Sequence, residues 1–333
     1  IKITLYRTSG NSPIVKALEL AARNGKQVTV FIELKARFDE KQNIEWATRL
    51  QNAGVIVIYG IVNLKLHAKM MIIVRKEDNE ILRYVHLSTG NYNENTAKLY
   101  SDISIFTAEP EIANDATLFF NMISGYSALQ TMQKIKIAPI NLKSNLISLI
   151  EREIQNSSPE KPGLIIAKMN SLAHPEVIQA LYKASCANVK IKLNVRGICM
   201  LVPGVKNLSE NIQVTSIIDR YLEHSRICYF QNGGDEEIYL SSADWMPRNL
   251  DRRVEIMFPI LNKSIFTRIK SILNTYLEDT ENTSILNSDG SWSKILNSQT
   301  EKKFSAQKHF HELAKTIEKS QKENLTGEFV VRR

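Results

Sequence analysis

Residues 65–74 read KLHAKMMIIV, in which a histidine and a lysine stand directly before an apolar run. The run Met70–Val74 is typical of a strand that is buried on both faces. His67 and Lys69 are two residues apart, so on an extended chain their side chains point to the same face. This places a nucleophile beside a positive charge at the start of a strand, although a histidine held at a strand end for packing fits the motif as well.

A second copy of this layout lies further along the chain. Residues 223–230 read EHSRICYF, again with a histidine, a cation two residues later and an apolar run. Other matching features keep a similar separation, which falls from 162 residues between Pro13 and Pro175 to 153 between Ser88 and Ser241. Equivalent residues in one order predict a duplicated domain.

Strand and helix patterns alternate in both copies. We expect the first unit to have strands at 3–6, 28–34, 55–59, 83–87 and 102–106, and the second to have strands at 163–169, 189–195 and 253–258. Ser12 followed by Pro13 predicts the start of a helix, with Ser12 as its cap, as does Pro175 in the second copy. The fold class is therefore α/β: two tandem units of mixed sheet flanked by helices and related by a pseudo-twofold axis.

The units are expected at residues 1–132 and 133–333. The second carries an extra strand at 135–138 and helix at 145–154, so we expect the first to be truncated at its N-terminal end. Residues 279–293 are polar and predict a loop, and residues 302–322 predict a terminal helix.

Composition limits the choice of partner and compartment. In 333 residues, 43 Lys and Arg against 35 Asp and Glu give a net charge of +8, which favours an anionic partner such as a phosphate chain, a nucleic acid or a lipid headgroup. Three cysteines without a pairing or metal-binding pattern indicate free thiols in a reducing compartment. We expect a cytoplasmic protein, and attachment to the inner membrane as a peripheral protein stays open.

Two histidines from equivalent strands would face one cleft if the units pair about a twofold axis. Arg7, Arg37 and Arg196 end predicted strands, where ligands of α/β sheets collect. Neutral imidazole is a good nucleophile toward phosphorus, guanidinium groups disfavour its protonation, and they also neutralise phosphate oxygens. Phosphoryl transfer therefore fits best. A phosphodiesterase of lipid or nucleic acid and a non-catalytic polyanion-binding module are the alternatives.

Motifs along most of the chain resemble one bacterial family. They lie at residues 5–8, 33–40, 67–70, 90–93, 167–172, 195–199, 223–226 and 241–253. Over roughly residues 1–275 the chain resembles bacterial polyphosphate kinase, in the long form that works through a phosphohistidine. The resemblance implies two phospholipase D-like C-terminal domains that reversibly transfer the ATP γ-phosphate to polyphosphate with Mg²⁺. It also implies an N-terminal and a helical domain elsewhere in the same chain, homo-oligomers of the full-length protein, and no role for nucleic acid.

The resemblance also gives roles to residues. His67 matches the phosphorylated histidine and His224 the second histidine, at the nucleotide phosphates. Tyr100 and Arg196 match nucleotide-phosphate contacts, and we expect Lys69 and Arg226 to bind phosphate as well. Arg7 and Arg37 match the pair assigned to magnesium. A guanidinium has no lone pair for a dication, so these two are expected to hold phosphate oxygens that the metal shares.

Two departures separate the chain from phospholipase D enzymes. Their signature has an Asp five residues after its Lys, where this chain has Val74 in the first copy and Gln231 in the second. In the second copy Arg226 also replaces the Lys. The phosphodiesterase alternative is therefore the weaker one.

Overall fold

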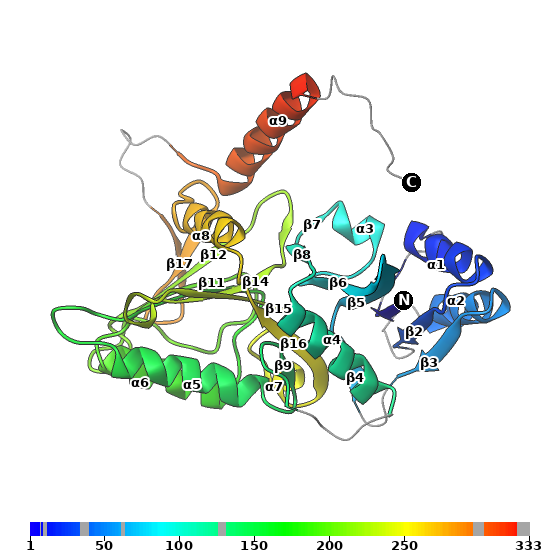
Figure 1. Cartoon of the computed structure of the whole chain (residues 1–333). Coiled ribbons are helices and arrows are strands. Elements are labelled where there is room, and N and C mark those ends of the chain that lie inside the picture. Colours follow the sequence, from blue (N-terminus) through cyan, green and yellow to red (C-terminus); the bar gives the residue numbers. More distant parts are fainter. Residues whose placement is uncertain are drawn as a thin grey trace.

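The computed structural model describes residues 1–6, 8, 12–33, 40–60, 64–125, 131–295 and 303–324, with the backbone alone for 40–43 and 320–324. Figure 1 shows a chain that folds into two sheets with helices against them. The predicted α/β class, with tandem units of mixed sheet and flanking helices, is confirmed.

The first sheet belongs to the N-terminal half of the chain. Its order is β3-β2-β1-β5-β6-β8, formed by β1 (Lys2–Leu5), β2 (Thr29–Ile32), β3 (Ile56–Tyr59), β5 (Met70–Glu77), β6 (Glu80–Ser88) and β8 (Ser104–Thr107). The helices of this half are α1 (Pro13–Arg23), α2 (Glu40–Asn52), α3 (Glu94–Ala97) and α4 (Pro110–Ile123).

The second sheet has the order β18-β17-β12-β11-β10-β14-β15-β16-β4, and β9 also pairs with β16. Its strands are β4 (Lys65–Leu66), β9 (Lys136–Ala138), β10 (Leu164–Met169), β11 (Lys190–Val195), β12 (Ile212–Ile217), β14 (Arg226–Phe230), β15 (Glu237–Ser241), β16 (Arg253–Pro259), β17 (Thr283–Leu286) and β18 (Trp292–Lys294). Its helices are α5 (Leu142–Gln155), α6 (Pro175–Cys186), α7 (Pro247–Leu250), α8 (Lys263–Leu277) and α9 (Ala306–Asn324), with a 3₁₀ turn at Asn232–Gly234.

The pairing of strands repeats between the two sheets. β1 pairs in parallel with β2 and antiparallel with β5, as β10 does with β11 and β14. β5 and β6 form an antiparallel hairpin, as do β14 and β15. The strands that follow His67 and His224 therefore occupy equivalent central positions. Among the described residues, β9 and α5 of the second unit have no counterpart in the first.

Two strand pairings join the halves within the part of the chain that the structure describes. The short strand β4, just before His67, pairs in parallel with β16 of the second sheet through Lys65↔Arg253 and Leu66↔Val254. A separate two-stranded sheet pairs β7 (Tyr100–Ser101) with β13 (Leu222–Glu223). Both connections use the residues that immediately precede a histidine, so each histidine lies where the halves meet.

The described core contains a cluster that crosses between the halves. One cluster packs α1 and α2 on the first sheet, and another packs α5 and α6 on the second. A third contains residues of both sheets together with α4 and α8, for example Ile72, Phe120, Ile227 and Leu273. Strand alternation explains this, because Ile165 belongs to the α5–α6 cluster whereas its neighbour Ile166 belongs to the shared one.

Several predictions differ from the structure. Residues 279–293 are not a simple loop, because β17 and β18 extend the second sheet there. Ser12 stands at the N-cap of α1, but its hydroxyl makes no capping hydrogen bond. The terminal helix α9 begins at Ala306, four residues later than predicted.

All three cysteines carry free thiols. No described helix is both long and apolar enough to cross a membrane.

Candidate active site

His67 lies between β4 and β5 and is almost fully buried, with 8% of its surface exposed. The amides of His67 and Ala68 both donate to the carbonyl of Val254, at 2.9 and 2.8 Å, which fixes the backbone against β16. The imidazole Nδ1 lies 2.8 Å from Oε1 of Glu255, and the ring packs edge-on against Tyr6 at 4.7 Å between centroids. An ionised carboxylate only accepts, so Nδ1 carries the hydrogen and Nε2 keeps its lone pair.

Lys69 provides the positive charge beside this ring. Its Nζ lies 2.9 Å from both Nδ1 and Nε2 of His67 and 2.6 Å from the His67 carbonyl oxygen. Burial lowers the pKa of His67 to about 3, which the charge on Lys69 reinforces and Glu255 opposes. Burial also lowers the pKa of Lys69 to about 7. The imidazole is therefore neutral at physiological pH, and the main cause is burial rather than the guanidinium groups that the sequence suggested.

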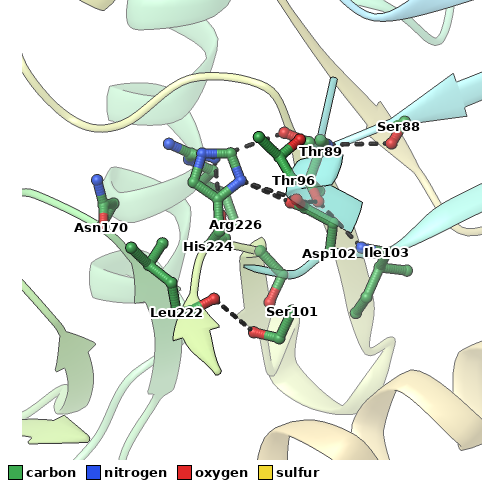
Figure 2. Close-up of polar contacts among 12 residues, drawn as sticks. Ser88, Thr89, Thr96, Ser101, Asp102, Ile103, Asn170, Leu222, His224 and Arg226 are labelled. Atoms are coloured by element: carbon green, nitrogen blue, oxygen red, sulfur yellow. Dashed lines mark hydrogen bonds and ion pairs between the residues drawn. The ribbon is translucent and has the colours of Figure 1, made fainter. Parts of the chain in front are cut away.

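His224 follows β13 and has the same kind of partners (Figure 2). Its Nδ1 lies 2.8 Å from Oδ1 of Asp102, and Nη1 of Arg226 lies 3.0 Å from Nε2. The Tyr100 ring is 5.1 Å away between centroids. Burial and the charge on Arg226 lower the pKa of His224, whereas Asp102 raises it. In each copy of the repeat, the cation two residues after the histidine thus contacts Nε2 of that histidine.

Each histidine is held by a carboxylate from the other half of the chain. Asp102 belongs to the first half and binds His224, whereas Glu255 belongs to the second half and binds His67. The two carboxylates are equivalent in the repeat, 153 residues apart like Ser88 and Ser241. Burial opposes ionisation of both, but the histidine contacts and neighbouring hydroxyls lower the pKa of both. Neither ring can keep its orientation unless the halves stay together.

The hydroxyls that hold these carboxylates are also equivalent. Thr89 donates to Asp102 at 2.7 Å and Ser242 donates to Glu255 at 2.5 Å. Asn249 of α7 also donates to Glu255, at 2.7 Å. Fixing the carboxylate fixes the tautomer of the histidine it binds.

Arg196 is connected to His224 through a chain of contacts. Arg226 forms an ion pair with Asp244 at 3.0 Å, and Asp244 accepts the Asn170 amide at 2.8 Å. The Asn170 side-chain oxygen in turn accepts from Nε of Arg196 at 2.7 Å. Arg196 is half-buried and directly follows β11.

The structure brings the predicted site residues together at one interface. Tyr100 and Arg226 contact His224, Arg196 is linked to Arg226 through Asn170 and Asp244, and Lys69 lies against His67. The charge on Lys69 also lowers the pKa of His224, so the two centres are electrostatically coupled. Arg7 and Arg37 lie outside the described residues. A pocket of about 330 Å³ opens beside Tyr100 and Asp102, with Pro13, His86 and Tyr92 in its lining.

Sequence reasoning missed the anchoring residues. Asp102, Glu255 and Asp244 were not named as site residues, although each is bound to a histidine or an arginine and the last two are buried. A signal existed, because Asp102 and Glu255 are acidic residues at equivalent positions of the repeat.

A magnesium site made of protein ligands does not fit the described residues. They contain no group of three or more His, Cys, Asp or Glu side chains that could hold a metal. The carboxylates nearest the histidines are already bound, Asp102 and Glu255 to imidazoles and Asp244 to Arg226. Lys69 and Arg226, in contrast, each place a cation against a histidine.

Comparison with known proteins identifies the family. Residues 1–129 match the model of polyphosphate kinase C-terminal domain 1, and residues 135–307 match that of C-terminal domain 2. The chain is 54% identical over 292 residues to a polyphosphate kinase of Synechocystis sp., covering 88% of this chain and 40% of that protein. It is 54% identical over 295 residues to one of Pseudomonas aeruginosa, covering 89% and 43%.

A solved structure agrees with these matches. The crystal structure of polyphosphate kinase from Porphyromonas gingivalis superposes with a TM-score of 0.88 at 40% identity, covering 96% of this chain and 49% of that one. The chain therefore spans about half or less of the length of these relatives. By both of its matched domains, the chain belongs to the polyphosphate kinase family.

Proposed function

We propose that the protein is an ATP–polyphosphate phosphotransferase, which moves the γ-phosphate of ATP reversibly to polyphosphate through a phosphohistidine at His67. The observation that carries the proposal is the buried, neutral imidazole of His67, whose Nδ1 is held by Glu255 and whose ring lies against the ammonium of Lys69. A neutral imidazole with a fixed tautomer has its lone pair ready for attack on phosphorus.

Two in-line displacements would complete the reaction. In the first, Nε2 of His67 attacks the γ-phosphorus, the bond to the β–γ bridging oxygen breaks, and ADP leaves with the electron pair. In the second, a terminal oxygen of polyphosphate attacks the same phosphorus and the N–P bond breaks. Lys69 would neutralise the transferred group, and removing such a cation typically costs about a thousandfold in rate.

The second centre would hold the nucleotide phosphates. Arg226 and Tyr100 contact His224, and Arg226 and Arg196 are oriented by Asp244 and Asn170, which bind each other. His224 would accept a proton from an attacking phosphate oxygen, because its lowered pKa leaves it neutral before reaction. In the reverse direction its imidazolium would donate that proton to the leaving phosphate oxygen. The pocket beside Tyr100 is large enough for part of a nucleoside.

Magnesium would enter with the nucleotide. Mg²⁺ keeps several waters and is commonly bound through substrate phosphates, which fits a site whose described carboxylates are already in use. Arg7 and Arg37 would hold oxygens of the same phosphates. We also propose a cytoplasmic enzyme that is open to peripheral contact with the inner membrane, acts as a homo-oligomer, and has no need of nucleic acid.

Phosphate labelling tests the proposal directly. Incubation of the protein, in the full-length form made by its host, with ATP labelled at the γ-phosphate should give label on His67 that is lost in acid and kept in base. His67→Ala should abolish the label. His309→Ala is the matched control, because His309 is exposed on α9. Equal labelling of His67→Ala, or cleavage of a phosphodiester without ATP, would show that the assignment is wrong.

A further inference from the structure

A buried polar cluster is centred on the residue that precedes His224, and its side chains have no part in the proposed chemistry. Its centre is Glu223, which is 1% exposed and immediately precedes His224. Glu223 forms an ion pair with Lys168 at 2.9 Å and accepts from Ser101 at 2.7 Å. Burial opposes ionisation of Glu223, but Lys168 and the other donors lower its pKa, so the carboxylate is charged.

Gln307 is the member of this cluster that comes from the C-terminal helix. Its Nε2 donates to Oε1 of Glu223 at 2.6 Å and to the Tyr221 carbonyl at 2.9 Å. Its Oε1 accepts the Tyr221 amide at 2.8 Å. Gln307 is only 7% exposed. Its side-chain oxygen and nitrogen therefore both bind, away from solvent, the segment that leads to His224.

The first turn of α9 is held in place by other contacts as well. The Ala306 amide donates to Asp279 at 2.8 Å, and the Phe310 ring meets Tyr276 at 5.2 Å between centroids. From residue 311 to 319 the side chains are exposed, and Figure 1 shows this part of α9 leaving the body of the molecule. The contacts of α9 are thus concentrated in the turn that contains Gln307.

The segment that Gln307 holds joins the two halves at the site. β13 pairs with β7 through Leu222↔Tyr100 and Glu223↔Ser101, and the Ser225 amide donates to the Ser101 carbonyl at 2.9 Å. Ser101 is also bonded to the Leu222 carbonyl, as Figure 2 shows. This two-stranded clasp (β7 with β13) carries Tyr100 at one end and leads into Asp102 and His224 at the other.

We propose that Gln307 is a positioning residue, which sets the place of His224 and Tyr100 by holding Tyr221 and Glu223. The inference rests on the proposed function, because it concerns the nucleotide-phosphate side of that site. Without the amide, Glu223 loses a donor and the Tyr221 backbone loses both of its partners. The clasp then loosens at the point where the imidazole of His224 must face phosphate, and misplaced groups of this kind cost rate.

Substitution to alanine is the first test. Gln307→Ala should lower kcat/KM for ATP by about tenfold while KM for polyphosphate changes by less than about twofold. Lys315→Ala, on the exposed part of the same helix, is the control and should behave as the wild type. Equal kinetics of Gln307→Ala and wild type would overturn the proposal.

Substitution to glutamate separates positioning from simple packing. Gln307→Glu would place a second carboxylate against Glu223, where the 2.6 Å hydrogen bond now lies. Two carboxylates this close retain a shared proton more readily than a single carboxylate does. The shared proton restores a donor to Glu223, so activity relative to wild type should recover as pH falls from 8 to 6. A variant that is equally impaired at all pH values would contradict the assignment.

Hydrogen–deuterium exchange gives a readout that does not need catalysis. In Gln307→Ala, exchange should rise in residues 219–225 and 99–103, and stay unchanged in residues 66–72 around His67. If the wild-type protein transferred no phosphate but exchange still rose in residues 219–225 and 99–103 of Gln307→Ala, the proposed function would fail. The positioning role of Gln307 would stand. Unchanged exchange in both segments would remove the positioning role alone.

Discussion

Lys69 and Arg226 occupy equivalent places, two residues after the two histidines, but they respond differently to burial. Burial lowers the pKa of Lys69 to about 7, and the charge on Arg226 adds to this. For Arg226, burial is outweighed by Asp244, which raises the pKa of the guanidinium. A pKa lowered from 10.5 means that Lys69 is charged below about pH 7 and loses its charge as pH rises through that value.

The first prediction concerns this charge. Activity should fall above about pH 7 as Lys69 deprotonates, and Lys69→Arg should move that alkaline limb upward because arginine stays charged. The rate at the optimum should be lower, since a guanidinium does not reproduce the contacts of Nζ with His67. A profile of kcat/KM between pH 6 and 9 measures both effects, with Lys192→Arg on the surface as control. An unmoved alkaline limb would assign it to another group.

The second prediction concerns the residues that stand next to the carboxylates. A Cβ on Gly90 would lie 2.2 Å from Oδ2 of Asp102, whereas the equivalent residue in the second half is Ala243. Gly90→Ala should therefore displace Asp102, release His224 and cost about 2 kcal/mol of stability. Ala243→Gly is the matched control and should cost about 1 kcal/mol. Urea unfolding and kcat/KM for ATP test this, and a harmless Gly90→Ala would contradict it.

At the scale of elements, α4 holds the connection between the two halves. Asp115 is fully buried and accepts the backbone amides of Gln133, Lys134 and Ile135, at 3.0, 2.6 and 2.8 Å. These residues lead directly into β9, which pairs with β16 beside Glu255. The Asp115 carboxylate thus accepts from three successive backbone amides that lie outside any described helix or strand.

The third prediction follows from those bonds. Asp115→Ala should lower the free energy of unfolding by about 3 kcal/mol, because buried amides are left without acceptors and bonds to a charged group are lost. Glu111→Ala, on the same helix, removes only an exposed ion pair with Lys134 and should cost less than about 1 kcal/mol. Equal effects of the two substitutions in urea unfolding would contradict the role of Asp115.

The elements that periodicity could predict are those that bury one clear face. The central strands and the helices that begin at Pro13 and Pro175 fit this rule and lie where expected. β18 could not be predicted, because it is an edge strand whose three residues are all exposed. β17 is only four residues long and is buried at its two ends, so it shows no apolar alternation either. The histidine–cation motifs were visible in the sequence, whereas the link from Asp244 to Arg196 depends on loops that only the fold brings together.

At the scale of the whole molecule, the two matched domains are not independent bodies. Each supplies the carboxylate that orients the histidine of the other, and β4 of the first half pairs within the sheet of the second. A core cluster contains side chains of both sheets together with α4 and α8. Each half therefore contributes to the free energy of unfolding of the other. If one half unfolded alone, it would expose core residues of the other half and leave a carboxylate there without its histidine.

The last prediction is that the protein unfolds in one cooperative transition. Ile3→Ala alters a cluster confined to the first half and Leu181→Ala one confined to the second, and both side chains are fully buried. Each substitution should cost about 2–5 kcal/mol and shift the same single transition for the whole chain. Calorimetry, with fluorescence and circular dichroism as independent probes, measures this. If Ile3→Ala moved one transition and Leu181→Ala another, the halves would be uncoupled, and reciprocal support of the histidines could not persist in solution.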